Sequence, residues 1–196
     1  MYRYNDYLTD KKLHHINPDF ENIGKYGEHE MDEIIENLYL GNYKAAYNLK
    51  ELNNHNIKKI VIICDNIETP FKNMGIKYFN IPVKDRDLDK KEFNNGINVN
   101  EYMINKMTQA LAFIYKGLLN KEGVLIHCKK GASRSACLTR LFLMLVYNKD
   151  KQEATDFIKQ RRFIAFPSEK NIFNFENPIM RNKKIITDKI IELFHT

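Results

Sequence analysis

The sequence predicts an α/β fold, with a central mixed, mostly parallel sheet flanked by helices. Short apolar runs such as 59–64 and 123–126 are continuous, as in strands that are covered on both faces. Longer segments between these runs repeat their apolar residues every three or four positions, as helices do. Strands and helices therefore alternate along the chain, which favours parallel pairing.

The predicted elements follow in chain order. Strands are expected at 34–42 (a pair with a turn at Gly41–Asn42), 59–64, 76–83 and 123–126. Helices are expected at 43–53, 101–119, 136–147, 150–162 and 184–194. The helix at 136–147 is apolar nearly all round, so it should be central and buried.

The length and composition fit one folded domain with an arm. The chain has 196 residues, of which 43% are hydrophobic, enough for a substantial core. Residues 1–30 are polar and predict an N-terminal arm, which offers a route to a homodimer, whereas residues 31–196 are expected to form the domain. Lys and Arg total 31 against 25 Asp and Glu, an excess that suits a phosphorylated partner and is also common on ordinary surfaces.

No membrane span is expected, because no apolar stretch approaches the ~20 residues that one requires. Three cysteines do not make a disulfide framework, which favours an intracellular location, the cytoplasm in the simplest case, with the nucleus or a virion left open. His14–His15 has no second ligand pair at a matching spacing, so no metal site is expected.

The segment 127–135 predicts an anion-binding loop between a strand and a helix. The N–H groups of the first helical turn have no partner within the helix and carry positive potential. Gly131 lets the backbone curl so that N–H groups of residues 129–133 (Lys129, Lys130, Gly131, Ala132 and Ser133) point inward as a nest. Arg134 can bind two phosphate oxygens in its planar fork.

Cys128 is the candidate nucleophile of this loop. A free thiol has a pKa of about 8.5, and an electropositive loop favours the thiolate. The thiolate can attack phosphorus in line and form a covalent intermediate. Ser135 can donate a hydrogen bond to the sulfur when it leaves, and His127 is expected to orient the loop through its ring nitrogens and to lower the thiol pKa.

The pattern His-Cys-x-x-Gly-x-x-Arg-Ser at 127–135 resembles the signature of the cysteine-based protein phosphatases, and its Ser-Arg-Ser ending is similar to their dual-specificity branch. The segments 37–42 and 161–167 extend the resemblance over roughly residues 31–176. It implies a phosphatase-type phosphate loop, a dual-specificity catalytic domain at 31–196, and hydrolysis of phosphotyrosine and phosphoserine/threonine in phosphoprotein substrates. It also implies a cysteinyl-phosphate intermediate and no metal or cofactor. Ser168 stands where the family usually has Asn.

The resemblance also implies a general acid after the strand that ends Ile81-Pro82-Val83, and Asp85 matches that position. The segment 94–100 lengthens the interval to Cys128, so Asp87 and Asp89 remain alternatives. Some members of the superfamily carry a cysteine where Cys64 stands, and this resemblance implies a reversible Cys64–Cys128 disulfide, with plain core packing as the alternative.

Other functions are left open beside the dual-specificity phosphatase. Lys129 and Lys130 make the loop basic, which suits the same chemistry on phosphoinositides or an RNA 5′-triphosphate, although nucleic acid is not the expected partner. A non-catalytic phospho-binding module is least favoured, because Cys128, Arg134 and Ser135 are intact. No separate tyrosine-bearing recognition loop is evident in the sequence, which favours a shallow pocket that admits both short and long phosphorylated side chains.

Overall fold

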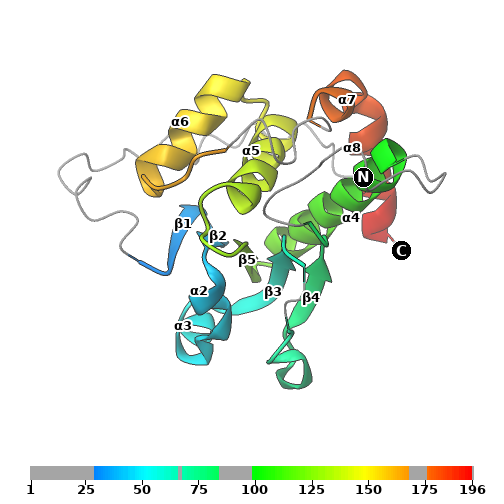
Figure 1. Ribbon diagram of the computed structural model, residues 1–196. Coiled ribbons are helices and arrows are strands. Elements are labelled where there is room, and N and C mark those ends of the chain that lie inside the picture. Colours follow the sequence, from blue (N-terminus) through cyan, green and yellow to red (C-terminus); the bar gives the residue numbers. More distant parts are fainter. Residues whose placement is uncertain (1–28, 66–67, 84–98, 168–175, 196) are drawn as a thin grey trace.

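The computed structural model describes residues 29–65, 68–83, 99–167 and 176–195. Its centre is a five-stranded mixed sheet with strand order β1-β2-β5-β3-β4 (Figure 1). The strands are β1 (Met31–Ile35), β2 (Leu38–Gly41), β3 (Ile57–Ile62), β4 (Lys77–Asn80) and β5 (Gly123–His127). Only β1 and β2 pair in antiparallel fashion, and the other three pairings are parallel. The predicted fold class is confirmed.

The hairpin turn between β1 and β2 lies at Glu36–Asn37, so the predicted turn at Gly41–Asn42 is wrong. Asn37 adopts the left-handed conformation (φ 64°) that a short side-chain amide tolerates. Gly41 instead ends β2 in close packing, since a Cβ there would lie 2.9 Å from the Glu30 carbonyl oxygen. Asn42 caps the following helix, its Oδ1 accepting from the Ala45 N–H at 3.1 Å.

The helices are α2 (Tyr43–Tyr47), α3 (Leu49–Asn54), α4 (Val99–Leu119), α5 (Arg134–Val146), α6 (Lys151–Arg161), α7 (Glu176–Arg181) and α8 (Lys183–His195). The single helix predicted at 43–53 is two helices, because Asn48 ends α2 and caps α3 through its side chain. Helix α7 was not predicted. No helix in the described segments is long and apolar enough to cross a membrane.

Alternate residues of the central strands point to opposite faces of the sheet and enter two cores. Val61, Ile63 and Ile126 belong to the larger core, formed with helices α4 to α8. Ile60, Ile62 and Cys64 belong to the smaller core, formed with α2 and α3 (Figure 1). Cys128 lies in this smaller core as well, so both site cysteines are on the face covered by α2 and α3.

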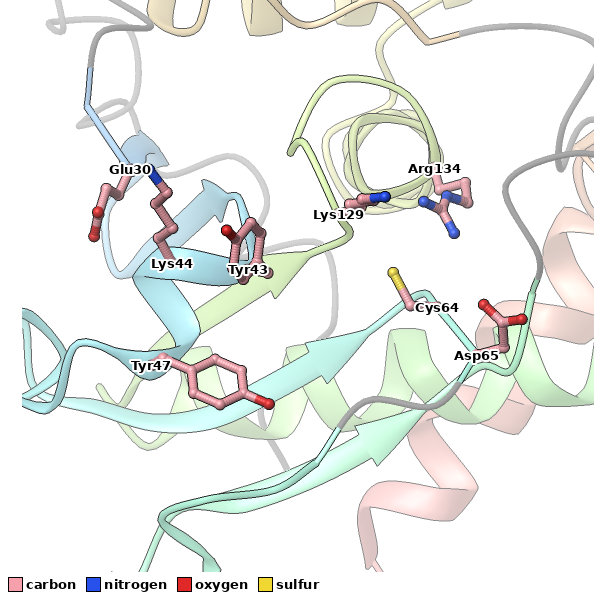
Figure 2. Close-up of a pocket in the computed structure, with 8 residues that line it drawn as sticks. All are labelled: Glu30, Tyr43, Lys44, Tyr47, Cys64, Asp65, Lys129 and Arg134. Atoms are coloured by element: carbon pink, nitrogen blue, oxygen red, sulfur yellow. The ribbon is translucent and has the colours of Figure 1, made fainter.

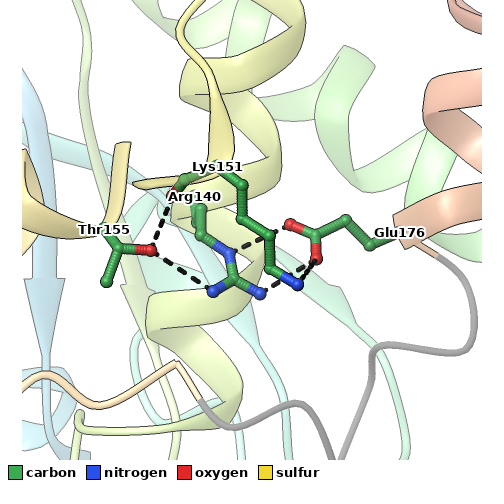
Figure 3. Close-up of polar contacts among 4 residues, drawn as sticks. All are labelled: Arg140, Lys151, Thr155 and Glu176. Carbon is green, nitrogen blue, oxygen red and sulfur yellow. Dashed lines mark hydrogen bonds and ion pairs between the residues drawn. The ribbon is translucent and has the colours of Figure 1, made fainter. Parts of the chain in front are cut away.

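Helix α5 is the next element after β5, across the loop 128–133, and all its residues are buried, as predicted. One of them, Arg140, carries a charge into the larger core. Its Nε and Nη2 donate to the two carboxylate oxygens of Glu176 at 3.0 and 2.9 Å, and its Nη1 donates to the Thr155 hydroxyl at 3.3 Å (Figure 3). The bidentate pair joins α5 to α7 and compensates a charge that would otherwise be costly to bury, and the bond to Thr155 joins α5 to α6.

Candidate active site

The site forms where three parallel strands end at the same edge of the sheet. Cys128 follows β5, Cys64 follows β3 by two residues, and Val83 follows β4 by three. Backbone hydrogen bonds continue the pairing past the strand ends, from the Ile63 N–H to the His127 carbonyl at 3.0 Å. The carboxyl ends of parallel strands are where α/β sheets place their ligands, so this edge is the natural location of a site.

The loop after Cys128 is held from outside by its carbonyl groups. The Tyr43 N–H donates to the Lys129 carbonyl at 3.4 Å, and the Phe166 N–H donates to the Ala132 carbonyl at 2.6 Å. Between these points, Arg162 donates from Nη2 to the Lys130 carbonyl at 3.5 Å and from Nε to the Gly131 carbonyl at 2.8 Å. Since four successive carbonyls bind outward, the N–H groups of the loop face the opposite side, where the Cys128 sulfur lies and an anion would bind.

Gly131 is required at the closest approach of this loop to the sheet. Its φ is +67°, in the left-handed region, and a Cβ there would lie only 2.3 Å from the Gly41 carbonyl oxygen. The predicted curl at Gly131 is therefore present, and it is enforced both by the backbone conformation and by contact with the end of β2.

The Cys128 sulfur receives hydrogen bonds from inside the loop. The Gly131 N–H lies 3.2 Å from Sγ and the Ser135 hydroxyl 3.3 Å from it. Burial alone would raise the pKa of this thiol, but the hydrogen bonds from Ser135, the positive charge of Arg134 and the Gly131 N–H outweigh that effect. The pKa of Cys128 consequently lies below its ordinary value. The arrangement favours a thiolate, the form in which sulfur is a nucleophile.

Arg134 opens helix α5 and is almost completely buried. Its Nη1 donates to the Val83 carbonyl at 3.0 Å, which ties the guanidinium to the chain that leaves β4. The side chain also lines the pocket in front of the loop (Figure 2). A guanidinium fixed in this way lies where it can bind phosphate oxygens.

His127 is fully buried behind the loop, and burial lowers the pKa of its ring to about 4. Its Nδ1 donates to the Cys128 carbonyl at 3.3 Å, whereas Nε2 has no hydrogen-bond partner among the described residues. The ring is thus neutral near pH 7. It contacts the first peptide of the loop through this hydrogen bond, but it brings no positive charge to the sulfur.

Cys64 lines the same pocket beside Lys129 and Arg134 (Figure 2). Burial raises the pKa of its thiol to about 11, although the charge of Arg134 and a hydrogen bond from the Lys129 backbone act in the opposite direction. Cys64 is therefore a neutral thiol next to a favoured thiolate. Cys137, one turn into α5, is buried in the larger core.

The pocket also contains residues that the sequence analysis missed. Tyr43 and Tyr47 of α2 line it together with Glu30 and Asp65 (Figure 2). The two tyrosines are nearly half exposed, at 46% and 43%. In the sequence these tyrosines are marked only by their four-residue spacing. That spacing puts both side chains on the same side of a helix, but it does not predict that this side lines a pocket.

Some predicted residues lie outside the described segments. These are the candidate acids Asp85, Asp87 and Asp89, the residue Ser168 at the position where the family usually has Asn, and the arm up to residue 28. His29 and Glu30, which the sequence assigned to the arm, do contact the domain, since Arg162 donates to the His29 carbonyl at 3.1 Å. Within the described segments, no group of three or more His, Cys, Asp or Glu side chains is arranged to hold a metal ion.

A family model described as dual specificity phosphatase, catalytic domain, matches residues 38–177. The chain belongs to the dual specificity phosphatase family. Over 138 residues it is 29% identical to dual specificity protein phosphatase 22 of Xenopus tropicalis, an alignment that covers 70% of this chain and 59% of that protein. The chain therefore corresponds to somewhat more than half the length of this relative.

Solved structures agree with this assignment at the level of the fold. The crystal structure of DUSP15 superposes with a TM-score of 0.67 at 23% identity, covering 83% of this chain and 95% of that one. The crystal structure of PTPMT1 in complex with PI(5)P superposes with a TM-score of 0.58 at 19% identity, covering 82% and 99%. The range matched by the family model includes the phosphate loop at 127–135.

Proposed function

We propose that this protein hydrolyses phosphotyrosine and phosphoserine/threonine in proteins through a cysteinyl-phosphate intermediate. Membership in the dual specificity phosphatase family supports the reaction class. The observation that carries the mechanism is the Cys128 sulfur, which accepts hydrogen bonds from Gly131 and Ser135 and has a lowered pKa.

In the first step the Cys128 thiolate attacks phosphorus, and the bond from phosphorus to the substrate oxygen breaks. The loop N–H groups and the Arg134 guanidinium bind the equatorial oxygens, whose charge grows in the transition state. In the second step water attacks the cysteinyl phosphate. The Ser135 hydroxyl, 3.3 Å from Sγ, donates to the sulfur as it leaves.

The leaving oxygen of the first step needs a proton, and we assign that role to Asp85. Support comes from Val83, whose carbonyl is bound to Arg134 inside the site. Asp85 lies two residues after Val83 in the sequence, whereas Asp87 and Asp89 lie four and six residues after it, so chain length restrains Asp85 most tightly to this anchor. Asp85→Asn should slow peptide hydrolysis severely and spare substrates with good leaving groups; the same result for Asp89→Asn instead would refute the assignment.

The direct test is hydrolysis of a phosphotyrosine peptide and a phosphothreonine peptide in the presence of EDTA. The wild type should hydrolyse both. Cys128→Ser should abolish turnover yet retain binding of the phosphopeptide, whereas the core variant Cys137→Ser should remain active. Binding without turnover in the wild type would instead identify a non-catalytic phospho-binding module.

A lipid substrate is the second candidate. The PTPMT1 complex contains a phosphoinositide on the same fold, and Lys129 and Lys130 of the present loop are both exposed. Turnover of phosphoinositide vesicles and of triphosphorylated RNA should be measured beside the peptides. A kcat/KM for either that exceeds the peptide values would reverse the order of the two proposals.

We also propose that Cys64 is the redox partner of Cys128. Both cysteines belong to the smaller core, and Cys64 accepts a hydrogen bond from the backbone of Lys129, the residue after the nucleophile. Peroxide would oxidise the Cys128 thiolate to a sulfenic acid, and the Cys64 sulfur would then displace water to form the disulfide. Absence of a Cys64–Cys128 peptide in the mass spectrum of peroxide-treated protein would refute this pairing.

The N-terminal arm, a homodimer formed through it and a cytoplasmic location stay predictions. Light scattering on the full chain and on a variant lacking residues 1–28 would test the first two. A dimer that persists without residues 1–28 would contradict a homodimer formed through the arm.

A further inference from the structure

The pocket in front of the phosphate loop is larger than phosphate binding requires. Its volume is about 720 Å³, within the range of sites that hold drug-sized ligands. Arg134, Lys129 and Cys64 lie toward one end, whereas Tyr43 and Lys44 lie away from them, toward Glu30 (Figure 2). A phosphoryl group held by the loop would therefore leave most of the cavity for other parts of the substrate.

The charges that line this cavity favour a cationic substrate group. The negative charges of the Cys128 thiolate and of the bound phosphate neutralise the positive charges of Lys129 and Arg134. Among the described residues that line the pocket, two carboxylates and one further cation remain. Asp65 lies at the end near Arg134, whereas Glu30 lies near Lys44 at the opposite end (Figure 2). With a phosphorylated residue bound, these described lining residues carry more negative than positive charge. A headgroup carrying additional phosphates would meet these carboxylates and be disfavoured.

Helix α2 adds an aromatic surface that is fixed relative to the loop. Ala45 and Ala46 are buried on one side of α2, and Tyr43 and Tyr47 lie on its exposed side. The Tyr43 N–H is bonded to the Lys129 carbonyl, so the position of the helix is coupled to that of the phosphate loop. A guanidinium is more weakly hydrated than an ammonium group. It therefore loses less hydration free energy when it stacks on a tyrosine ring.

We propose that this pocket selects a basic side chain, arginine above all, next to the phosphorylated residue of a peptide substrate. Glu30 with Tyr43 and Tyr47 would receive it on one flank, and Asp65 on the other (Figure 2). This inference rests on the proposed protein phosphatase activity and names its preferred substrates. Each carboxylate pairs with a cation on its own flank, and the tyrosine rings cover the planar face of a guanidinium bound near Glu30.

The test uses phosphotyrosine peptides that differ only in the residues flanking phosphotyrosine, with Arg, Ala or Glu on either side. On at least one flank the wild type should prefer Arg to Ala about fivefold in kcat/KM, as expected for one ion pair of about 1 kcal/mol. The Glu30→Gln/Asp65→Asn double variant should bring this ratio close to one, and Tyr47→Leu should lower it in part. Asp188→Asn, which removes an exposed carboxylate on α8, should keep the wild-type ratio.

Equal kcat/KM values for the Arg, Ala and Glu peptides would overturn this proposal, as would a preference that survives in the double variant. Faster turnover of phosphoinositide vesicles than of the Arg peptide would overturn it too. Failure of the wild type to hydrolyse any peptide is a different outcome, because it would refute the proposed function itself.

Discussion

Arg162 and Asp32 form a buried ion pair directly behind the phosphate loop. The two side chains are 0% and 4% exposed, and Nη1 of Arg162 donates to Oδ2 of Asp32. The other guanidinium nitrogens of Arg162 hold the carbonyls of Gly131 and Lys130. Asp32 therefore fixes Arg162, and Arg162 fixes the loop, so that one carboxylate in β1 influences the geometry around Cys128.

Removing one partner of this pair should destabilise the fold. Asp32→Asn leaves the Arg162 charge buried without its counter-charge, and we expect the free energy of unfolding in urea to fall by about 3 kcal/mol. Glu51→Gln breaks the partly exposed pair with His55 and should cost less than about 1 kcal/mol. Similar losses in the two variants would show that burial of the Arg162–Asp32 pair is not important.

The same pair should affect the thiolate. In Arg162→Lys the charge stays but the fork that holds two carbonyls is lost, so the Gly131 N–H should move away from the sulfur. We expect the pKa of Cys128, measured from the pH dependence of iodoacetamide alkylation, to rise, and kcat to fall about tenfold. A purely structural role for Arg162 would lower stability and leave the alkylation profile unchanged.

Ser135→Ala should separate the two chemical steps. Without the hydroxyl 3.3 Å from Sγ, the pKa of Cys128 should rise and the sulfur should leave more slowly, reducing kcat about tenfold. Slow breakdown of the cysteinyl phosphate should appear as a burst of product in rapid-quench experiments. Thr139→Ala is the control. It removes a hydroxyl that donates to the Ser135 carbonyl, one turn away, and should keep the wild-type pKa of Cys128.

The Arg140–Glu176 pair offers a test of stability alone (Figure 3). Glu176→Gln leaves a buried guanidinium without its bidentate carboxylate and should cost about 3 kcal/mol in urea unfolding. Lys151 also approaches Glu176, at 3.7 Å, but its side chain is 43% exposed, so Lys151→Met should cost less than about 1 kcal/mol. Equal costs would mean that bulk charge near Glu176, and not the buried pair, stabilises α7.

The sequence predicted the parts of the site that are contiguous in the chain. The strand, loop and helix around Cys128 follow from apolar periodicity and from residue types at fixed spacing. Asp32 and Tyr43 act on the loop from segments far away in the chain, and no local pattern marks such contacts. The misplaced turn has a similar cause: Gly41–Asn42 is a turn signal, but tertiary packing uses Gly41 for close approach and Asn42 as a cap.

The buried ring of His127 should make stability depend on pH. Its pKa is lowered from 6.5 to about 4 in the folded state, so between these values the unfolded chain binds a proton that the native state does not. The stability gained by burying a neutral ring is present above pH 6.5 and is lost as the pH falls toward 4. Between pH 7 and pH 5 the wild type should lose about 2 kcal/mol more than His127→Asn, which retains a donor for the Cys128 carbonyl but cannot titrate.

Urea unfolding of the wild type and His127→Asn at several pH values would measure this difference. Carboxylates contribute to the acid sensitivity of both proteins, so the difference between the two curves isolates the ring. His55→Asn, at a partly exposed histidine, should follow the wild-type curve. Parallel curves for the wild type and His127→Asn would mean that the ring is protonated in the folded state near pH 5. A cation would then lie directly behind the Cys128 carbonyl, and the neutral role assigned to His127 would be wrong.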